Sequence, residues 1–143
     1  MEYITLANGV KMPLLGYGVY QVDPAECERC VTDAIAVGYR SIDTAQAYHN
    51  EEGVGNAVRK SGLPREDFFL TTKVWISNGG YEKAKASIDE SLAKLQTDYI
   101  DLGMIHYVDR EDELDSIVNG PFYAYTKELK EKGVIRHIGL STH

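Results

Sequence analysis

Four side chains suited to proton transfer occur at similar points along this 143-residue sequence. Asp43 ends a short alternating run, and the phenol of Tyr48 follows shortly after it. Lys73 and His106 each come near the end of a later apolar run. An ammonium group stabilises a phenolate, a carboxylate compensates the ammonium charge, and an imidazole can orient the group that receives the proton. The sequence therefore predicts one proton-transfer site, provided that the fold brings the four together.

Each of these residues also has a plainer interpretation. Asp43 and Lys73 could form a structural ion pair, and a lone histidine such as His106 is more often a core residue with satisfied hydrogen bonds. Tyr48 is one of ten tyrosines, so it carries little weight alone. We favour a shared site because the four occur in order at the ends of successive predicted elements.

Alternating strands and helices would position these residues. The strands are expected over residues 14–21, 40–45, 68–74, 99–106 and 134–141. The helices are expected over residues 24–37, 50–60, 81–95 and 123–132. Asp23-Pro24 signals the first helix start, and Gly79-Gly80 should break the chain before the third helix. This alternation predicts parallel strands joined by right-handed crossovers.

Two further segments carry turn signals. Asn8-Gly9 between apolar runs predicts a hairpin over residues 3–12, which Pro13 ends. The acidic segment 109–115 leads towards the last helix, and Asn119-Gly120-Pro121 predicts that no single helix runs through both.

The similar lengths of the connections favour a barrel over a doubly wound sheet. A G-x-G-x-x-G motif is absent, because Gln21 stands where a third glycine should follow Gly16 and Gly18. We predict an α/β fold: a partial (β/α)8 barrel of TIM type, with about five parallel strands and four helices. Residues 1–143 would form a single domain, with a hairpin cap over 1–13 and βα units one to five over 14–143. Functional groups of such barrels gather at the C-terminal strand ends, which here are Gly18 to Tyr20, Asp43, Lys73, His106 and Ser141.

Charge and composition argue against several kinds of partner. The formal net charge of −7 disfavours nucleic acid and anionic membranes. No apolar run could span a bilayer and no signal peptide is recognisable, so the cytoplasm is the expected location. Cys27 and Cys30 fall on one helical face, which does not suit a disulfide.

We expect no metal site. A second pair of zinc ligands to join the two cysteines is not found in the sequence. His137 should lie well below the end of its strand, so it cannot join His106 and His143 around one ion. A metal-dependent barrel hydrolase remains an alternative that elemental analysis would test.

Four motifs, taken in order, resemble those of the aldo-keto reductases. They are residues 43–48 (Asp-Thr-Ala-Gln-Ala-Tyr), 71–75 (Thr-Thr-Lys-Val-Trp), 98–106 (Asp-Tyr-Ile-Asp-Leu leading to Ile-His) and 138–141 (Ile-Gly-Leu-Ser). The resemblance covers essentially the whole chain. It implies a (β/α)8 barrel whose bottom is plugged by the opening hairpin.

The same resemblance implies an NAD(P)H-dependent reduction of an aldehyde or ketone, with Tyr48 as proton donor. The implied catalytic residues are Asp43, Tyr48, Lys73 and His106. The implied cofactor contacts are Gly18, Val19, Tyr20, Asp43 and Ser141. The implied substrate pocket contains Tyr20, Trp75 and His106. NADPH is the expected cofactor, with NADH left open.

Two features depart from the family's pattern. A complete barrel of this type needs roughly 250 residues and eight strands, and this sequence supplies five strands. The absent strands would carry the aromatic that stacks on nicotinamide and the basic pocket for the cofactor phosphates, so little or no turnover is expected. The sequence up to about Leu102 also resembles one branch of the family and from Met104 another, with Thr142-His143 where asparagine usually follows the serine. A truncated or recombined gene would explain both.

The alternative from a different class is a non-catalytic half-barrel. Its first and fifth strands would keep unpaired outer edges, which favours self-association. Such a chain could persist as an oligomer or bind a protein partner.

Overall fold

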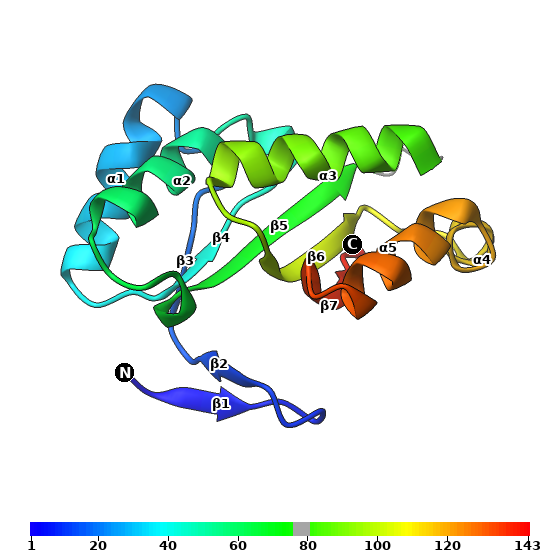
Figure 1. Ribbon diagram of the computed structural model, residues 1–143, viewed down its shortest axis with the longest axis horizontal. Helices are drawn as coiled ribbons and strands as arrows, with labels where there is room; N and C mark the ends of the chain where they lie inside the picture. Colours follow the sequence, from blue (N-terminus) through cyan, green and yellow to red (C-terminus); the bar gives the residue numbers. More distant parts are fainter. Residues whose placement is uncertain (76–80) are drawn as a thin grey trace.

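The computed structural model describes residues 1–75 and 81–143, and its main feature is a five-stranded parallel sheet (Figure 1). The strands follow in chain order as β3 (Gly16–Gly18), β4 (Ser41–Asp43), β5 (Phe69–Trp75), β6 (Ile100–His106) and β7 (Ile135–Leu140). This order confirms the predicted βα units and the parallel sheet. β3 and β4 are shorter than predicted, because their shared ladder pairs only three residues on each strand.

The helices lie against the outer face of this sheet (Figure 1). They are α1 (Pro24–Ala36), α2 (Glu51–Lys60), α3 (Tyr81–Leu95), α4 (Glu111–Val118) and α5 (Pro121–Glu131), with 3-10 turns η1 (Gln46–Tyr48) and η2 (Arg65–Asp67). Asp23 starts α1 as predicted, because its side chain accepts a hydrogen bond from the Ala25 amide at 2.8 Å. α3 has the predicted bounds, whereas the break expected at Gly79-Gly80 lies outside the described residues. No described helix has the length and apolar character needed to cross a membrane.

Helix α4 differs from our prediction, which treated residues 109–115 only as an acidic approach to the last helix. Glu111, Asp112 and Glu113 fill its first turn, where negative charge meets the positive end of the helix dipole. The structure therefore has a separate helix here, and Gly120 divides it from α5 as the turn signal predicted.

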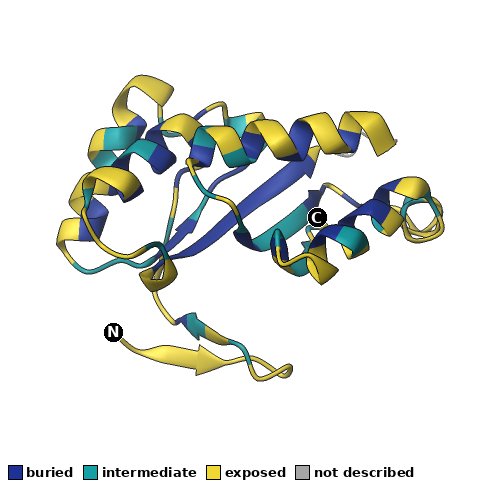
Figure 2. Ribbon diagram, in the orientation of Figure 1, coloured by how far each residue is buried: buried dark blue, intermediate teal, exposed yellow. Residues whose placement is uncertain are grey.

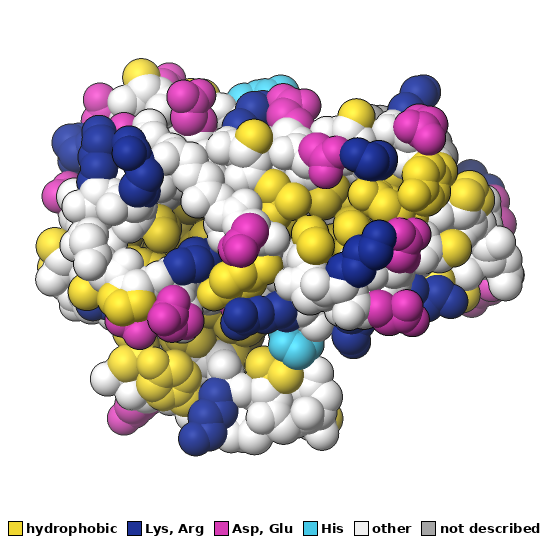
Figure 3. All heavy atoms as spheres, in the orientation of Figure 1, with side chains coloured by type: hydrophobic (Ala, Val, Ile, Leu, Met, Phe, Trp, Pro, Cys, Tyr) yellow, Lys and Arg dark blue, Asp and Glu magenta, His cyan; other side chains and the backbone are white. Residues whose placement is uncertain are grey.

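The hydrophobic core lies between the sheet and the helices (Figure 2). One cluster packs α1 and α2 on β4 and β5, and the other packs α3 and α5 on β5, β6 and β7. α2 and α3 approach closely at Gly55, where an added β-carbon would come 2.3 Å from the Lys94 carbonyl oxygen. Hydrophobic side chains reach the surface in the band between α3 and α5 (Figure 3). The rings of Tyr81 on α3 and Tyr125 on α5 lie 4.7 Å apart.

The hairpin of β1 (Tyr3–Thr5) and β2 (Lys11–Pro13) lies beyond the N-terminal ends of the sheet strands and is largely exposed (Figure 2). Pro13 belongs to β2 and pairs with Tyr3, so the hairpin runs one residue further than predicted. A cavity of about 600 Å³ lies between the hairpin and the strand starts, lined in part by Arg40 and Arg136. The hairpin is therefore at the opposite end of the sheet from the predicted site.

Candidate active site

Lys73 connects the predicted residues at the C-terminal edge of the sheet. Its ammonium group donates hydrogen bonds to Asp43 Oδ1 at 2.5 Å, to the Thr44 carbonyl oxygen at 3.0 Å and to Tyr48 Oη at 3.4 Å. These three acceptors match the three N–H donors of an ammonium group. Asp43 pairs with Thr71 in the β4–β5 ladder. Lys73 lies two residues further along β5 on the same face, so its side chain extends past the end of β4 to reach Asp43. Only 9% of the Lys73 side chain is exposed, and the Asp43 carboxylate compensates this nearly buried charge.

The 3-10 turn η1 presents Tyr48 to this cluster. Gln46 Nε2, at the start of the turn, donates to the Ser87 carbonyl oxygen at 2.7 Å and to Ser91 Oγ at 3.0 Å, both on α3. The Lys73 ammonium lies 5.0 Å from the centre of the Tyr48 ring. Hydrogen bonds to α3 thus hold Gln46 at the start of the turn, and the hydrogen bond from Lys73 holds Tyr48 at its end.

His106 completes the cluster from β6. Its ring centroid lies 6.1 Å from that of Tyr48 and 5.4 Å from that of Trp75, both in edge-to-face contact. Burial lowers the pKa of His106 from its ordinary value of 6.5, the Lys73 charge and then His143 lower it further, and Asp43 opposes them. The imidazole is therefore neutral at neutral pH and can donate one hydrogen bond.

An unpartnered polar atom points to a ligand at this site. His106 Nδ1 is buried and has no hydrogen-bond partner within the described part of the chain. Ser141 Oγ accepts a hydrogen bond from the Tyr107 amide at 3.1 Å, which leaves its own hydroxyl proton free to donate. Gly18 is exposed beside Asp43, and an added β-carbon there would meet nothing within 4 Å. These residues fit the nicotinamide end of a dinucleotide cofactor, which offers a flat ring and a carboxamide.

Val19 has a different environment from the other expected cofactor contacts. Its side chain is fully buried in the core. Its amide donates to the Asp43 carbonyl oxygen at 3.0 Å, and its carbonyl accepts from Asn50 Nδ2 at 2.9 Å. The structure therefore places Val19 behind the site, where it supports Gly18 and Tyr20.

Aromatic rings form the wall of the site. The Tyr20 ring lies 5.2 Å from that of Tyr48, and Trp75 is 37% exposed. We did not predict a role for Tyr107, whose ring lies 5.1 Å from Trp75 and 4.4 Å from His106. Its φ of 61° is a left-handed conformation that is unfavourable for an aromatic residue. An aromatic directly after a histidine at a strand end is the sequence signal that could have identified it.

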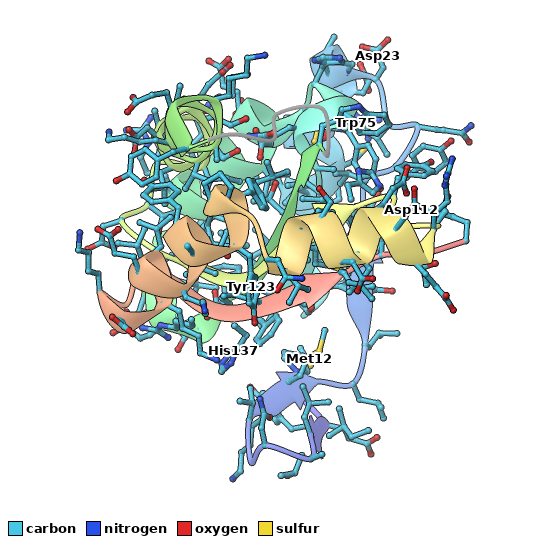
Figure 4. All side chains as sticks on the ribbon, turned by 90° about the vertical axis from the view of Figure 1, so that its right-hand side faces the viewer. Met12, Asp23, Trp75, Asp112, Tyr123 and His137 are labelled. Carbon is cyan, nitrogen blue, oxygen red and sulfur yellow. The ribbon has the colours of Figure 1, made fainter. Side chains whose placement is uncertain are left out.

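His137 and His143, which we did not expect to share a metal ion with His106, lie apart from each other. His137 lines the cavity beside the hairpin, at the opposite end of the sheet from Trp75 (Figure 4). His143 does reach the C-terminal edge, where it stacks on Tyr107 with ring centroids 4.2 Å apart. Across residues 1–75 and 81–143, no three His, Cys, Asp or Glu side chains are placed to hold a metal ion.

Comparison with known sequences gives one consistent result. Residues 7–143 match the sequence profile of the aldo/keto reductase family. It is 43% identical to a glyoxal reductase of Bacillus subtilis (strain 168), in an alignment that covers 98% of this chain and 49% of that protein. It is 44% identical to a methylglyoxal reductase of Yersinia pestis, with 96% and 47% covered. The chain therefore spans about half the length of the curated relatives it matches.

Solved structures agree with this result. An aldo/keto reductase from Brucella melitensis superposes with a TM-score of 0.87 at 43% identity, covering 99% of this chain and 54% of that chain. A putative 2,5-diketo-D-gluconic acid reductase B gives a TM-score of 0.81 at 40% identity, covering 98% and 48%. A five-stranded partial barrel is the part of those structures that this chain matches.

Proposed function

Because this chain belongs to the aldo/keto reductase family, we propose that its site serves the reduction of an aldehyde or ketone to an alcohol with NAD(P)H, with slow turnover by residues 1–143 alone. One observation carries the proposal: the Lys73 ammonium binds the Asp43 carboxylate and the Tyr48 hydroxyl together. We propose that residues 1–143 form a single domain that contains five βα units of the barrel.

The proposed roles follow from the chemistry of each side chain. Negative charge develops on the carbonyl oxygen during reduction. The Tyr48 hydroxyl gives its proton to that oxygen, and the Lys73 ammonium stabilises the phenolate that remains. Asp43 keeps Lys73 in position, and neutral His106 donates the hydrogen bond that orients the oxygen.

The remaining residues of the site would bind the reactants. When bound, the reduced cofactor supplies the hydride that the carbonyl carbon receives. Gly18 leaves room for its ring, and the Ser141 hydroxyl is free to donate to a carboxamide oxygen. The rings of Tyr20 and Trp75 would line the substrate position beside Tyr48 and His106. On the family resemblance we propose NADPH in preference to NADH.

The names of two relatives suggest the substrate. One is a glyoxal reductase and the other a methylglyoxal reductase. We therefore propose small dicarbonyl compounds as substrates, with an aldehyde carbon as the hydride acceptor.

NADPH consumption in the presence of methylglyoxal tests this proposal. The rate should be measured over a wide range of NADPH concentrations, because the cofactor's phosphate pocket is expected on later barrel strands. Tyr48→Phe keeps the ring and removes the proton, so it should lower the rate by about 10²–10⁴-fold. Tyr123→Phe, on α5, is the matched control and should leave the rate unchanged. Equal rates in the wild type and Tyr48→Phe would refute the proposal.

A second proposal rests on the edges of the sheet. Within the described sheet, β3 and β7 each pair with one neighbour only. Leu140, the last residue of β7, is 44% exposed. Unpaired strand edges are templates for association. We propose that copies of this chain associate through these edges, which is compatible with carbonyl reduction.

A further inference from the structure

Asn50 stands directly before α2, at the position where asparagine ordinarily caps a helix. Its side chain makes no capping hydrogen bond. The residue is 1% exposed, so its amide is buried and must find hydrogen bonds elsewhere. The side chain therefore serves contacts outside its own helix.

The hydrogen bonds of this amide go to segments that build the candidate active site. Nδ2 donates to the carbonyl oxygens of Val19 at 2.9 Å and Val22 at 3.1 Å, which lie on either side of Tyr20. Oδ1 accepts a hydrogen bond from Thr44 Oγ1 at 2.8 Å. The backbone carbonyl of that same Thr44 is one of the three acceptors of the Lys73 ammonium. One buried amide thus joins residues 19–22, here called the Tyr20 loop, to Thr44, which holds Lys73.

We propose that Asn50 is a positioning residue, which fixes the Tyr20 loop and the Lys73 acceptor at one distance from Tyr48. This inference rests on the proposed function. Tyr20 is 63% exposed, so core packing holds it weakly, yet its ring lies 5.2 Å from that of Tyr48. The hydrogen bonds from Asn50 to Val19 and Val22, on either side of Tyr20, set the distance between the Tyr20 and Tyr48 rings. Asn50 acts on the reaction only through these neighbours.

Two substitutions separate this role from simple packing. Asn50→Ala removes the tether altogether. Asn50→Asp keeps the volume and can still accept from Thr44, but its carboxylate cannot donate to the two carbonyls. We expect both variants to lower kcat for methylglyoxal reduction by about tenfold or more, with little change in the KM for NADPH, because small displacements of reacting groups reduce rates strongly. If the Asn50 side chain only filled space, Asn50→Asp should keep the wild-type kcat.

Asn56→Ala provides the matched control. It changes the same residue type on the same helix, but the Asn56 amide donates to Glu28 Oε2 at 3.1 Å on α1, away from the site. We expect it to keep the wild-type kcat. Wild-type kcat in both Asn50 variants would overturn the inference.

Hydrogen–deuterium exchange tests the tether without any turnover. The amides of Val19, Val22, Thr44 and Tyr48 are hydrogen-bonded, so their exchange reports on local opening. Asn50→Asp should speed exchange over residues 19–22 and 44–48, and Asn56→Ala should not. If the wild type does not reduce methylglyoxal, the proposed function fails, but faster exchange in Asn50→Asp still supports the tether. Unchanged exchange over residues 19–22 overturns the inference whether or not the chain is active.

Discussion

Trp75, the single tryptophan of this chain, is a built-in reporter of His106, because their rings lie 5.4 Å apart. Burial, the Lys73 charge and His143 lower the pKa of His106, so it takes up a proton only in more acidic solution than a free histidine does. A protonated imidazole quenches a neighbouring indole. We expect Trp75 fluorescence to fall as the pH decreases, with a midpoint below the ordinary value of 6.5.

Two variants assign this transition. His106→Gln should abolish it. His49→Gln should leave it in place, although His49 is exposed and lines one pocket together with Trp75. A midpoint at or above 6.5, or a transition that survives in His106→Gln, would show that the pKa shift is wrong.

The sequence was informative about residues whose role depends on their place at a strand end. Asp43, Lys73 and His106 could be predicted to converge because parallel strands bring their C-terminal ends to one edge. The role of Asn50 could not be predicted, because an asparagine before Glu51-Glu52 is typical of a helix cap. Its acceptor at Val19 comes close only when the chain has folded. The orientation of Tyr107 could not be predicted either, since its amide donates to Ser141, which lies on a distant part of the sequence, and its φ is positive.

Gly55 sets the distance between α2 and α3. In an open helix, replacing glycine with alanine would stabilise the fold by about 1 kcal/mol. Here the new methyl group would come 2.3 Å from the Lys94 carbonyl oxygen and 2.7 Å from the Leu95 carbonyl carbon, both backbone atoms. Overpacking of this kind costs about 1–3 kcal/mol or more and outweighs the gain.

We therefore expect Gly55→Ala to lower the free energy of unfolding by about 1–2 kcal/mol in urea denaturation. Arg59→Ala, at an exposed position of the same helix, should change it by less than about 0.5 kcal/mol. Wild-type stability in Gly55→Ala would mean that the two helices can move apart at no cost.

Whole elements were predictable where periodicity is long and unambiguous. Both bounds of α3 were predicted correctly, and Ala84, Ile88 and Leu95 are buried along the face that helical periodicity turns to the core, with Leu92 partly buried beside them. The length of β3 was not predictable, because a strand ends where its neighbour stops pairing, which is a tertiary property. For α4, we gave the acidic composition too little weight as a helix-start signal.

The two open edges of the sheet govern how the whole molecule should behave in solution. If copies pair through β3 and β7, the apparent mass in size-exclusion chromatography with light scattering should rise with protein concentration. Leu140→Lys places a charge on the β7 edge and should shift the equilibrium towards the monomer.

Leu63→Lys is the corresponding control. Leu63 is 36% exposed and lies in the connection from α2 to η2, which leads into the central strand β5, so its substitution should leave the association unchanged. A well-folded wild type that remains monomeric at every concentration would count against association through the edges.

The order of the strands in the sheet is also their order in the chain. Each strand of this sheet after β3 therefore finds a pairing partner among residues that the ribosome has already made. The sheet can grow one βα unit at a time during synthesis, with no strand waiting for a later one to be inserted beside it. Nascent chains should accordingly gain protease resistance in steps, as each successive unit leaves the exit tunnel.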